Sequence, residues 1–379
     1  MRGNLDLQAL VEVIGPQFAE GAAERDAGDV FVAGHYDTLK GHKVFSALVP
    51  EELGGGGASH GAMCAFLRRL AQFCPSTALA LSMHQHLVAA AAWNHRNGRP
   101  GRALLERVAA AETVLVSTGA GDWLESNGTV ERAEGGFRIS ARKPFCSGAP
   151  AGGVLVTSAP YEDPAEGWQV LHFPVPFSAE GVSIAEDWRT VGMRATGSHT
   201  VVLDRVFVPE AAVALRRPRG RFHPAWNTIL TAALPLIMSV YAGVAEAAAG
   251  IALEHAKRRP GGGGDPALPY LLGEMGNHLT VAQLAVDDMV RLARDLDGPM
   301  GLDLTGAILA RKTIAAEHVV ATAEKAMEVA GGAGFYRGLG LERLLRDAQG
   351  ARLHPLPAKR QHRFAGRVAL GLDPIADAA

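Results

Sequence analysis

The spacing of apolar residues changes twice along this 379-residue chain. Up to about residue 111 they recur at the three- and four-residue intervals of amphipathic helices; from 113 to 208 they mostly alternate in short runs; beyond Pro218 the helical interval returns. The sequence therefore predicts an α+β multidomain protein. We place an N-terminal helical domain at residues 1–112, a central β domain at 113–217 and a C-terminal helical domain at 218–379.

Capping residues and breakers delimit the elements within these regions. Ser59 is an N-cap candidate, Pro75 suits a first helical turn, and Gly331 with Gly332 suits a helix end. The helices expected are 5–25, 30–40, 59–73, 75–97, 102–111, 226–258, 269–297, 305–330 and 341–352, the last four forming a four-helix bundle. The strands expected are 113–117, 129–132, 137–143, 153–158, 168–173, 183–185 and 200–208, which predict a compact barrel or sandwich.

The segment Thr228 to Ala245 carries no charge and is about as long as a membrane span requires. Small residues (Ala, Gly and Ser) are interspersed among its larger apolar residues, and the pattern continues into Glu246 and Glu254 like an ordinary helix end. We expect a helix that is buried on all sides, either in the bundle or in an oligomer interface, and no membrane partner.

Composition excludes several classes of protein. With 48% hydrophobic and 20% charged residues the chain is expected to be globular, and a formal net charge of -2 gives no reason to expect nucleic acid as a partner. Cys64, Cys74 and Cys146 show no paired or metal-ligand spacing, and the N-terminal residues lack an apolar leader, so we expect a cytoplasmic protein. His84 and His86 are two residues apart and cannot share a helix face, so they are expected to be core histidines and no metal site is predicted.

Small and hydroxylated residues gather in the stretch from Trp188 to Pro209, directly before an apolar strand. Gly192 and Gly197 permit close approach of the backbone, and the Thr and Ser side chains offer hydrogen-bond donors. The stretch is either a loop that binds a large planar ligand or a polar turn that leads into the strand.

Four segments in this order resemble the acyl-CoA dehydrogenase superfamily of flavoproteins. They are LVPEELGGGGAS at 48–59, KPFCSGA at 143–149, GMRATGSHTVVLDRVFVP at 192–209 and AGGAGFYRGLGLERLLRDA at 330–348. The resemblance implies a helical N-terminal domain, a small central β-barrel and a C-terminal four-helix bundle. It also implies FAD, with FMN less expected, in a homotetramer whose neighbouring subunit completes the adenosine end of the cofactor site.

The resemblance assigns two sets of flavin contacts. The isoalloxazine ring is expected against Ser117, Gly119, Gly121, Phe145, Cys146 and Ser147. Without the family, Phe145 would be an ordinary core aromatic. The adenosine end of a partner's cofactor is expected at Arg258, Glu328, Gly331, Gly332 and Gly334, although PGGGGDPALP after Arg259 departs from the family pattern.

The chain lacks the catalytic carboxylate at both positions where the family usually has one, because Pro355 and Asn227 stand there. His354, beside the first position, is our candidate catalytic residue, since the oxygen-using two-component flavin monooxygenases of the superfamily have a histidine in this neighbourhood. As an alternative, His354 only caps a helix end. The other carboxylates considered as a base are Glu51, Glu52, Asp122 and Glu125.

Three functions are therefore considered. The first is FAD-dependent CH–CH dehydrogenation of an acyl thioester such as an acyl-CoA, with an unusual base and an electron-acceptor flavoprotein. The second is a two-component monooxygenase that receives reduced flavin from a flavin reductase and acts on a small aromatic or amine substrate. The third is a non-catalytic binding or assembly protein. We narrowly favour the first from the sequence.

Overall fold

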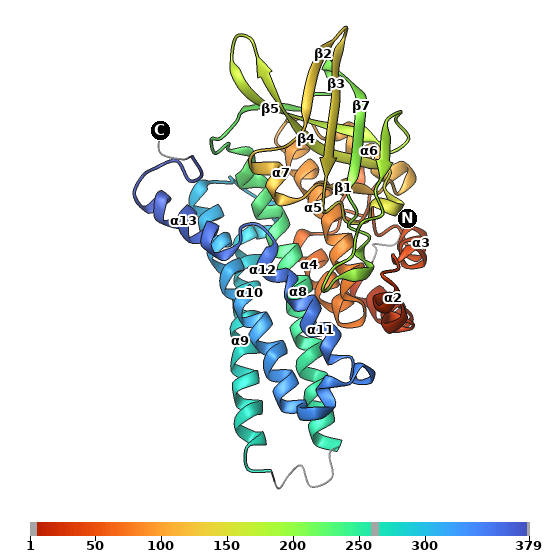
Figure 1. The fold of residues 1–379 in the computed structure, drawn as a ribbon, viewed down its shortest axis with the longest axis vertical. Coiled ribbons are helices and arrows are strands. Elements are labelled where there is room, and N and C mark those ends of the chain that lie inside the picture. The colour runs from red at the N-terminus through yellow and green to blue at the C-terminus, as the bar shows by residue number, and fades with distance from the viewer. Residues whose placement is uncertain (1–5, 259–264, 377–379) are drawn as a thin grey trace.

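The computed structural model describes residues 6–258 and 265–376 and has the expected order of helical, β and helical regions (Figure 1). The N-terminal helices are α1 (Leu7–Ala19), α2 (Ala22–Gly28), α3 (Ala33–Gly41), α4 (His60–Phe73), α5 (Pro75–Arg96) and α6 (Arg102–Ala111). Ser59 caps α4 as predicted, because its side chain accepts a hydrogen bond from the Ala62 amide. The single helix expected over 5–25 is two helices, broken where Gly21 adopts a left-handed conformation with φ 64°.

The central region contains two four-stranded sheets. One has the order β1-β4-β5-β8, from β1 (Leu115–Ser117), β4 (Val154–Asp163), β5 (Gly167–Pro176) and β8 (Leu215–Pro218). The other has the order β2-β3-β7-β6, from β2 (Thr129–Ala133), β3 (Gly136–Lys143), β7 (Val201–Pro209) and β6 (Val182–Ile184). All seven expected strands are present. The expected barrel consists of these two sheets, and among the described residues no strand is shared between them.

Two elements of the central region were missed by the sequence analysis. The strand β8 contains Arg216, Arg217 and Pro218, which do not resemble a strand, but it pairs antiparallel with β5. The short helix α7 (Ala120–Leu124) follows β1 and interrupts what was expected to be a loop.

The C-terminal region is a helical bundle that extends away from the sheets (Figure 1). Its long helices are α8 (Ala225–Arg258), α9 (Leu268–Ala293) and α10 (Leu302–Ala330), and its shorter ones are α11 (Leu341–Ala348), α12 (Gly350–Leu353) and α13 (Ala358–Ala369). The fourth helix, expected over 341–352, is divided at Gln349, and α13 was not expected. The end of α10 at Gly331 agrees with the prediction, since Gly331 is its C-cap.

Helix α8 contains the uncharged segment and is the one helix of the described residues long and apolar enough to cross a membrane. Within its most apolar window 94% is buried inside the chain, where α8 contacts α4, α5, α9 and α10. A Cβ atom on Gly243 would lie 2.0 Å from the Arg68 carbonyl oxygen, so α8 and α4 approach closely there. The expectation of an interior helix is confirmed. Because one chain covers this segment, it gives no argument for a second subunit.

Candidate functional site

An exposed aromatic side chain and a row of hydroxyl groups meet at one edge of the β domain. Phe145 has a left-handed backbone, φ 60°, and its side chain is 56% exposed, with its ring edge-on to Trp188 at 5.7 Å between centroids. The Ser147 and Ser198 hydroxyls are 2.8 Å apart, and the Ser198 and Thr196 hydroxyls are 2.7 Å apart. A strained non-glycine conformation that presents an aromatic ring to solvent is typical of a ligand-binding position.

Backbone hydrogen bonds join the three segments that form this edge. The Gly119 amide donates to the Pro144 carbonyl at 3.1 Å, the Cys146 amide to the His199 carbonyl at 3.2 Å, and the Gly148 amide to the Thr196 carbonyl at 2.9 Å. The structure thus brings the predicted flavin-side residues together. Ser117 is buried in β1, and Cys146 is buried with its thiol donating to the Lys143 carbonyl, so neither of these side chains faces the edge.

A buried ion pair supports these segments from behind. Lys143, fully buried at the end of β3, pairs with Asp122 of α7 and donates to the carbonyls of Asn127 at 2.8 Å and Ser158 at 2.6 Å. Thr118 also donates to Asp122, at 2.7 Å. Asp122, one of the other carboxylates considered as a base, is therefore engaged in structural contacts. These contacts fix α7 to β3 and β4.

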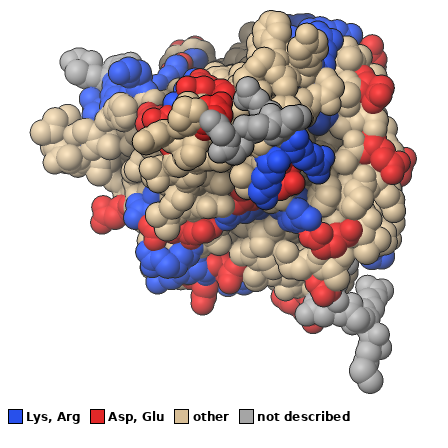
Figure 2. All heavy atoms as spheres, turned by 90° about the horizontal axis from the view of Figure 1, so that it is seen from below, with Lys and Arg blue, Asp and Glu red and all other residues tan. Residues whose placement is uncertain are grey.

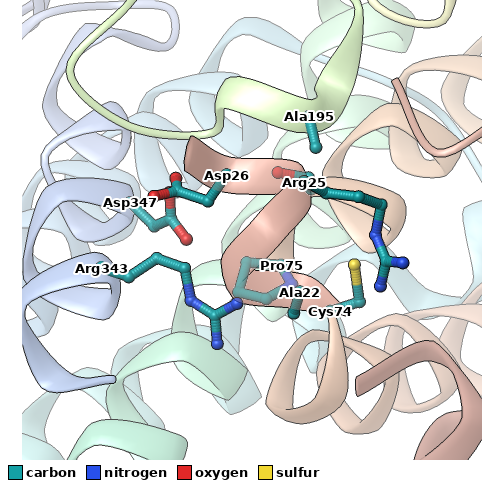
Figure 3. A pocket seen from close by; sticks show the side chains of 9 residues that line it. Ala22, Arg25, Asp26, Cys74, Pro75, Ala195, Arg343 and Asp347 are labelled. Atoms are coloured by element: carbon teal, nitrogen blue, oxygen red, sulfur yellow. The ribbon is translucent and has the colours of Figure 1, made fainter. Parts of the chain in front are cut away.

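The loop before β7 is attached to the last part of the bundle. The Met193 amide donates to the Asp347 carboxylate, and a Cβ on Gly192 would lie 2.3 Å from the Arg346 carbonyl oxygen. Asp347 lines a hollow of about 10 Å³, room for one water molecule. Figure 3 shows the Asp26 and Asp347 carboxylates next to one another there, with Arg343 below them. Burial raises the pKa of Asp347 to about 6. The segments at 192–209 and 330–348, both of which resemble the family, thus contact each other through residues 193 and 347.

His354 follows α12 and its side chain turns into the protein. Its Nε2 forms a 2.9 Å hydrogen bond with the hydroxyl of Tyr241, which is fully buried on α8. The Tyr241 hydroxyl is held against Gly350, where an added Cβ would come within 2.4 Å. Burial, reinforced by the charge of Lys312 and by His86, lowers the pKa of His354 to about 3. The imidazole is therefore neutral throughout the physiological pH range.

His86 is the other histidine at this site, and it was expected to be a satisfied core residue. That expectation is correct for His84, whose two ring nitrogens contact the Phe45 carbonyl at 2.8 Å and the Leu115 amide at 2.9 Å. His86 is buried, yet its Nδ1 has no hydrogen-bond partner among the described residues. A buried polar atom without a partner is uncommon and suggests that a ligand or water completes the contact.

Both positions of the usual catalytic glutamate are without a carboxylate. Pro355 directly follows His354, and Asn227 is buried at the start of α8, where its side-chain oxygen accepts from Thr305 of α10 at 2.8 Å. Glu51 and Glu52 are exposed in a short helical turn before α4, and Glu125 is exposed after α7. Among the described residues, the hydrogen-bond partner of His354 is Tyr241 rather than a carboxylate.

The residues predicted for the adenosine end lie at the opposite end of the bundle from the β domain (Figure 1). Arg258 ends α8 and is highly exposed, Glu328 pairs with Lys325 at 2.8 Å, and Gly331, Gly332 and Gly334 form the turn after α10. The aromatic side chains of Phe335 and Tyr336 beside this turn are 86% and 75% exposed. Figure 2, viewed from this end, shows basic and acidic side chains intermixed with broad areas of other residues. Within one chain, the two predicted halves of the cofactor site are therefore not brought together.

Several candidate functional residues were not identified from the sequence. Tyr241 and Lys312 lie inside apolar helices, and only the fold shows that they surround His354. Trp188 was noted only as the start of its loop. Among residues 6–258 and 265–376, no group of three or more His, Cys, Asp or Glu side chains is placed to hold a metal ion.

Comparisons with known proteins agree with this arrangement. The family model described as the acyl-CoA dehydrogenase N-terminal domain matches residues 8–112, and the model described as the C-terminal domain matches residues 226–354. These two matches cover most of both helical regions.

Relatives that match over most of their length include a nitrososynthase, a probable FMNH2-dependent monooxygenase and a putative acyl-CoA dehydrogenase. Amino sugar nitrososynthase DnmZ from Streptomyces peucetius is 28% identical over 89% of this chain and 86% of its own. The probable FMNH2-dependent monooxygenase SfnC from Pseudomonas putida is 26% identical over 91% and 90%. The structure of KijD3 in complex with FMN and dTDP-3-amino-2,3,6-trideoxy-4-keto-3-methyl-D-glucose has a TM-score of 0.87 at 27% identity, over 98% of this chain and 95% of that one.

Proposed function

Because this chain belongs to the acyl-CoA dehydrogenase superfamily, we propose that it is a flavin-dependent monooxygenase, which receives reduced flavin from a separate reductase and oxidises a small amine or aromatic substrate. The observation that carries this proposal is the neutral, tyrosine-bound His354, directly beside Pro355 at the position where a dehydrogenase needs a carboxylate base. We therefore reverse the narrow preference for acyl thioester dehydrogenation that was drawn from the sequence alone.

The residues at the edge of the β domain fit a flavin. Phe145 offers an exposed aromatic surface, and the partly buried Ser147 ends a row of three hydroxyl groups, so that it has hydrogen-bonding capacity left for a ring nitrogen or oxygen. Backbone bonds fix the segments that carry these groups. Preorganised donors of this kind orient the ring and stabilise negative charge on it.

The acid–base properties of the interior argue against α-proton removal. A base for that step must face the substrate and hold a proton well, whereas a histidine whose pKa is about 3 is a weak base near neutral pH. Burial raises the pKa of Tyr241 far above its usual value, so its hydroxyl remains protonated. The charge of Asp347 contributes to the raised pKa of Tyr241, but the Asp347 carboxylate already accepts a hydrogen bond from the Met193 backbone amide.

The same properties suit an oxygen-using enzyme. Reduced flavin supplies two electrons with which O2 is split, one oxygen atom passing to the substrate and the other leaving as water. A neutral imidazole can donate or accept one hydrogen bond at this place without adding charge, and Tyr241 fixes its orientation. The buried His86, with its free Nδ1, offers a second such group.

The relatives support an amine as the substrate and FMN as a possible form of the cofactor. DnmZ is named an amino sugar nitrososynthase, SfnC is named FMNH2-dependent, and the KijD3 complex contains FMN and an amino sugar nucleotide. FAD, which the resemblance implied, would additionally require the adenosine contacts near Gly331, and these need a second subunit. We propose that such a subunit, in a dimer or tetramer, covers the exposed Phe335 and Tyr336.

Dehydrogenation of an acyl-CoA remains the second candidate, because both matched family models bear that name. The two functions differ in what an acyl-CoA does to bound oxidised flavin. We expect that no member of a panel of acyl-CoAs, added without oxygen, bleaches the flavin absorbance of the reconstituted protein. Bleaching by any of them would support dehydrogenation and contradict the oxygenase proposal.

A further inference from the structure

Lys312 of α10 is a buried cation without a partner of opposite charge. Its side chain is 1% exposed, and among the described residues no carboxylate lies within ion-pair distance of its Nζ. Its neighbour Arg311, by contrast, pairs with Asp288 on α9. Burying an ammonium group without a counter-charge is energetically unfavourable. An unpaired ammonium group buried beside the segment that carries His354 points to a use for the charge.

Within the described part of the chain, the one side-chain hydrogen bond of Lys312 goes to the segment that carries His354. Nζ donates to the Leu356 carbonyl at 3.1 Å, two residues beyond the histidine. On its other side His354 is bound to Tyr241. Lys312 of α10 thus binds the backbone of this turn, and Tyr241 of α8 binds the imidazole of His354 in the same turn.

The charged and titratable groups around His354 come from three helices: His86 of α5, Tyr241 of α8 and Lys312 of α10. Tyr241 stays neutral, and burial lowers the pKa of His86 to about 4, so it is also neutral at pH 7. Burial lowers the pKa of Lys312 to about 8, and at neutral pH the lysine is still mainly protonated. Lys312 is therefore the positive charge that acts on His354, in addition to the effect of burial.

We propose that Lys312 is a positioning residue for His354: its ammonium group anchors the segment after the histidine and adds to the burial that disfavours a positive charge on the imidazole. The proposal rests on the function assigned above, in which a neutral His354 faces the substrate. It predicts that the charge of residue 312, rather than its size, decides how readily His354 takes up a proton.

The test is an NMR titration of His354 in the flavin-free protein, labelled on histidine, with His354→Ala used to assign its signal among the 14 histidines. Lys312→Met removes the charge and the hydrogen bond, Lys312→Gln removes the charge and keeps a donor, and Lys312→Arg keeps the charge. Arg311→Met is the matched control, since it removes an adjacent cation that faces Asp288. Circular dichroism defines the lowest pH at which each variant is folded.

At the lowest pH at which all variants are folded, we expect the protonated fraction of His354 to be about tenfold higher or more in Lys312→Met and Lys312→Gln, because a nearby charge typically shifts a pKa by about one unit or more. Lys312→Arg and Arg311→Met should match the wild type. An unchanged protonated fraction of His354 in Lys312→Gln would overturn the proposal. This outcome can be measured even if Lys312→Met does not fold. Because no flavin is present, this result is independent of the assay for oxygen use.

Discussion

Tyr241→Phe tests whether the hydrogen bond between Tyr241 and His354 positions the imidazole for catalysis. The substitution removes only the hydroxyl that meets His354 Nε2 at 2.9 Å, and the ring itself remains fully buried. A buried hydrogen bond of this kind contributes about 1 kcal/mol net. If the bond orients the imidazole equally in the transition state, its loss lowers turnover about fivefold, since about 1.4 kcal/mol corresponds to tenfold.

His354→Ala provides the second arm of the cycle. If His354 faces the reacting atoms, as proposed, loss of its hydrogen bond should lower turnover by roughly two to three orders of magnitude, the range for a lost hydrogen-bond donor at a reacting centre. If Tyr241 acts through His354, the double variant should be no slower than His354→Ala alone. Flavin affinity should be unchanged in all three, because the proposed ring contacts lie at Phe145 and Ser147.

The assay is oxygen consumption at saturating reduced flavin, with unfolding in urea measured alongside. Tyr161→Phe is the matched control, because the Tyr161 ring packs on Phe137 in the β domain, away from His354. A fivefold loss from Tyr241→Phe that persists unchanged in the His354→Ala background would refute the reasoning. So would full activity of His354→Ala, which would leave His354 only a helix-ending role costing about 1 kcal/mol of stability.

Three further predictions concern the cofactor, acid stability and assembly. Ser147→Ala should weaken flavin binding about fivefold, measured by fluorescence quenching, because one hydrogen bond of about 1 kcal/mol is lost. The free energy of unfolding should fall as the pH drops from 6.5 toward 4, by up to about 1.4 kcal/mol per pH unit for each buried histidine, because the unfolded chain takes up protons that the folded one rejects. Asp347, with a pKa raised to about 6, opposes this fall between pH 6 and 3.8, because there the folded chain binds one proton that the unfolded chain does not. Urea unfolding at a series of pH values measures the slope. The histidines concerned, with pKa values lowered to about 3 or 4, are His35, His84, His86, His172 and His354. Light scattering should show a dimer or tetramer that Phe335→Asp with Tyr336→Asp dissociates, and a wild-type monomer would contradict the proposed shared site.

The sequence predicted the helices and strands well where the local signals are strong. Ser59 and Pro75 begin α4 and α5 as expected, and the alternating apolar runs give seven of the strands. The failures have physical causes. β8 is held by pairing with β5 rather than by its own composition, and the helix expected over 341–352 is interrupted at a point that its apolar spacing does not mark.

The candidate site was only partly predictable, because much of it depends on contacts between distant segments. Phe145 and Ser147 could be found from a local motif. Tyr241 contacts His354 across 113 positions of the chain and Lys312 contacts Leu356 across 44, and both resemble ordinary helix residues. That Arg258 and Gly331 lie far from Phe145 could likewise be known only from the fold. Their roles in binding the cofactor remain predictions.

The central claim is that this chain transfers oxygen with reduced flavin. The most direct test supplies the purified protein with FMN, a flavin reductase, NADH and a panel of small amines under ¹⁸O₂, and follows the products by mass spectrometry. The account predicts that at least one amine product contains the heavy isotope and that His354→Ala lowers its rate of formation by roughly two to three orders of magnitude. Complete conversion of oxygen to hydrogen peroxide with every amine, together with anaerobic flavin bleaching by an acyl-CoA, would contradict it.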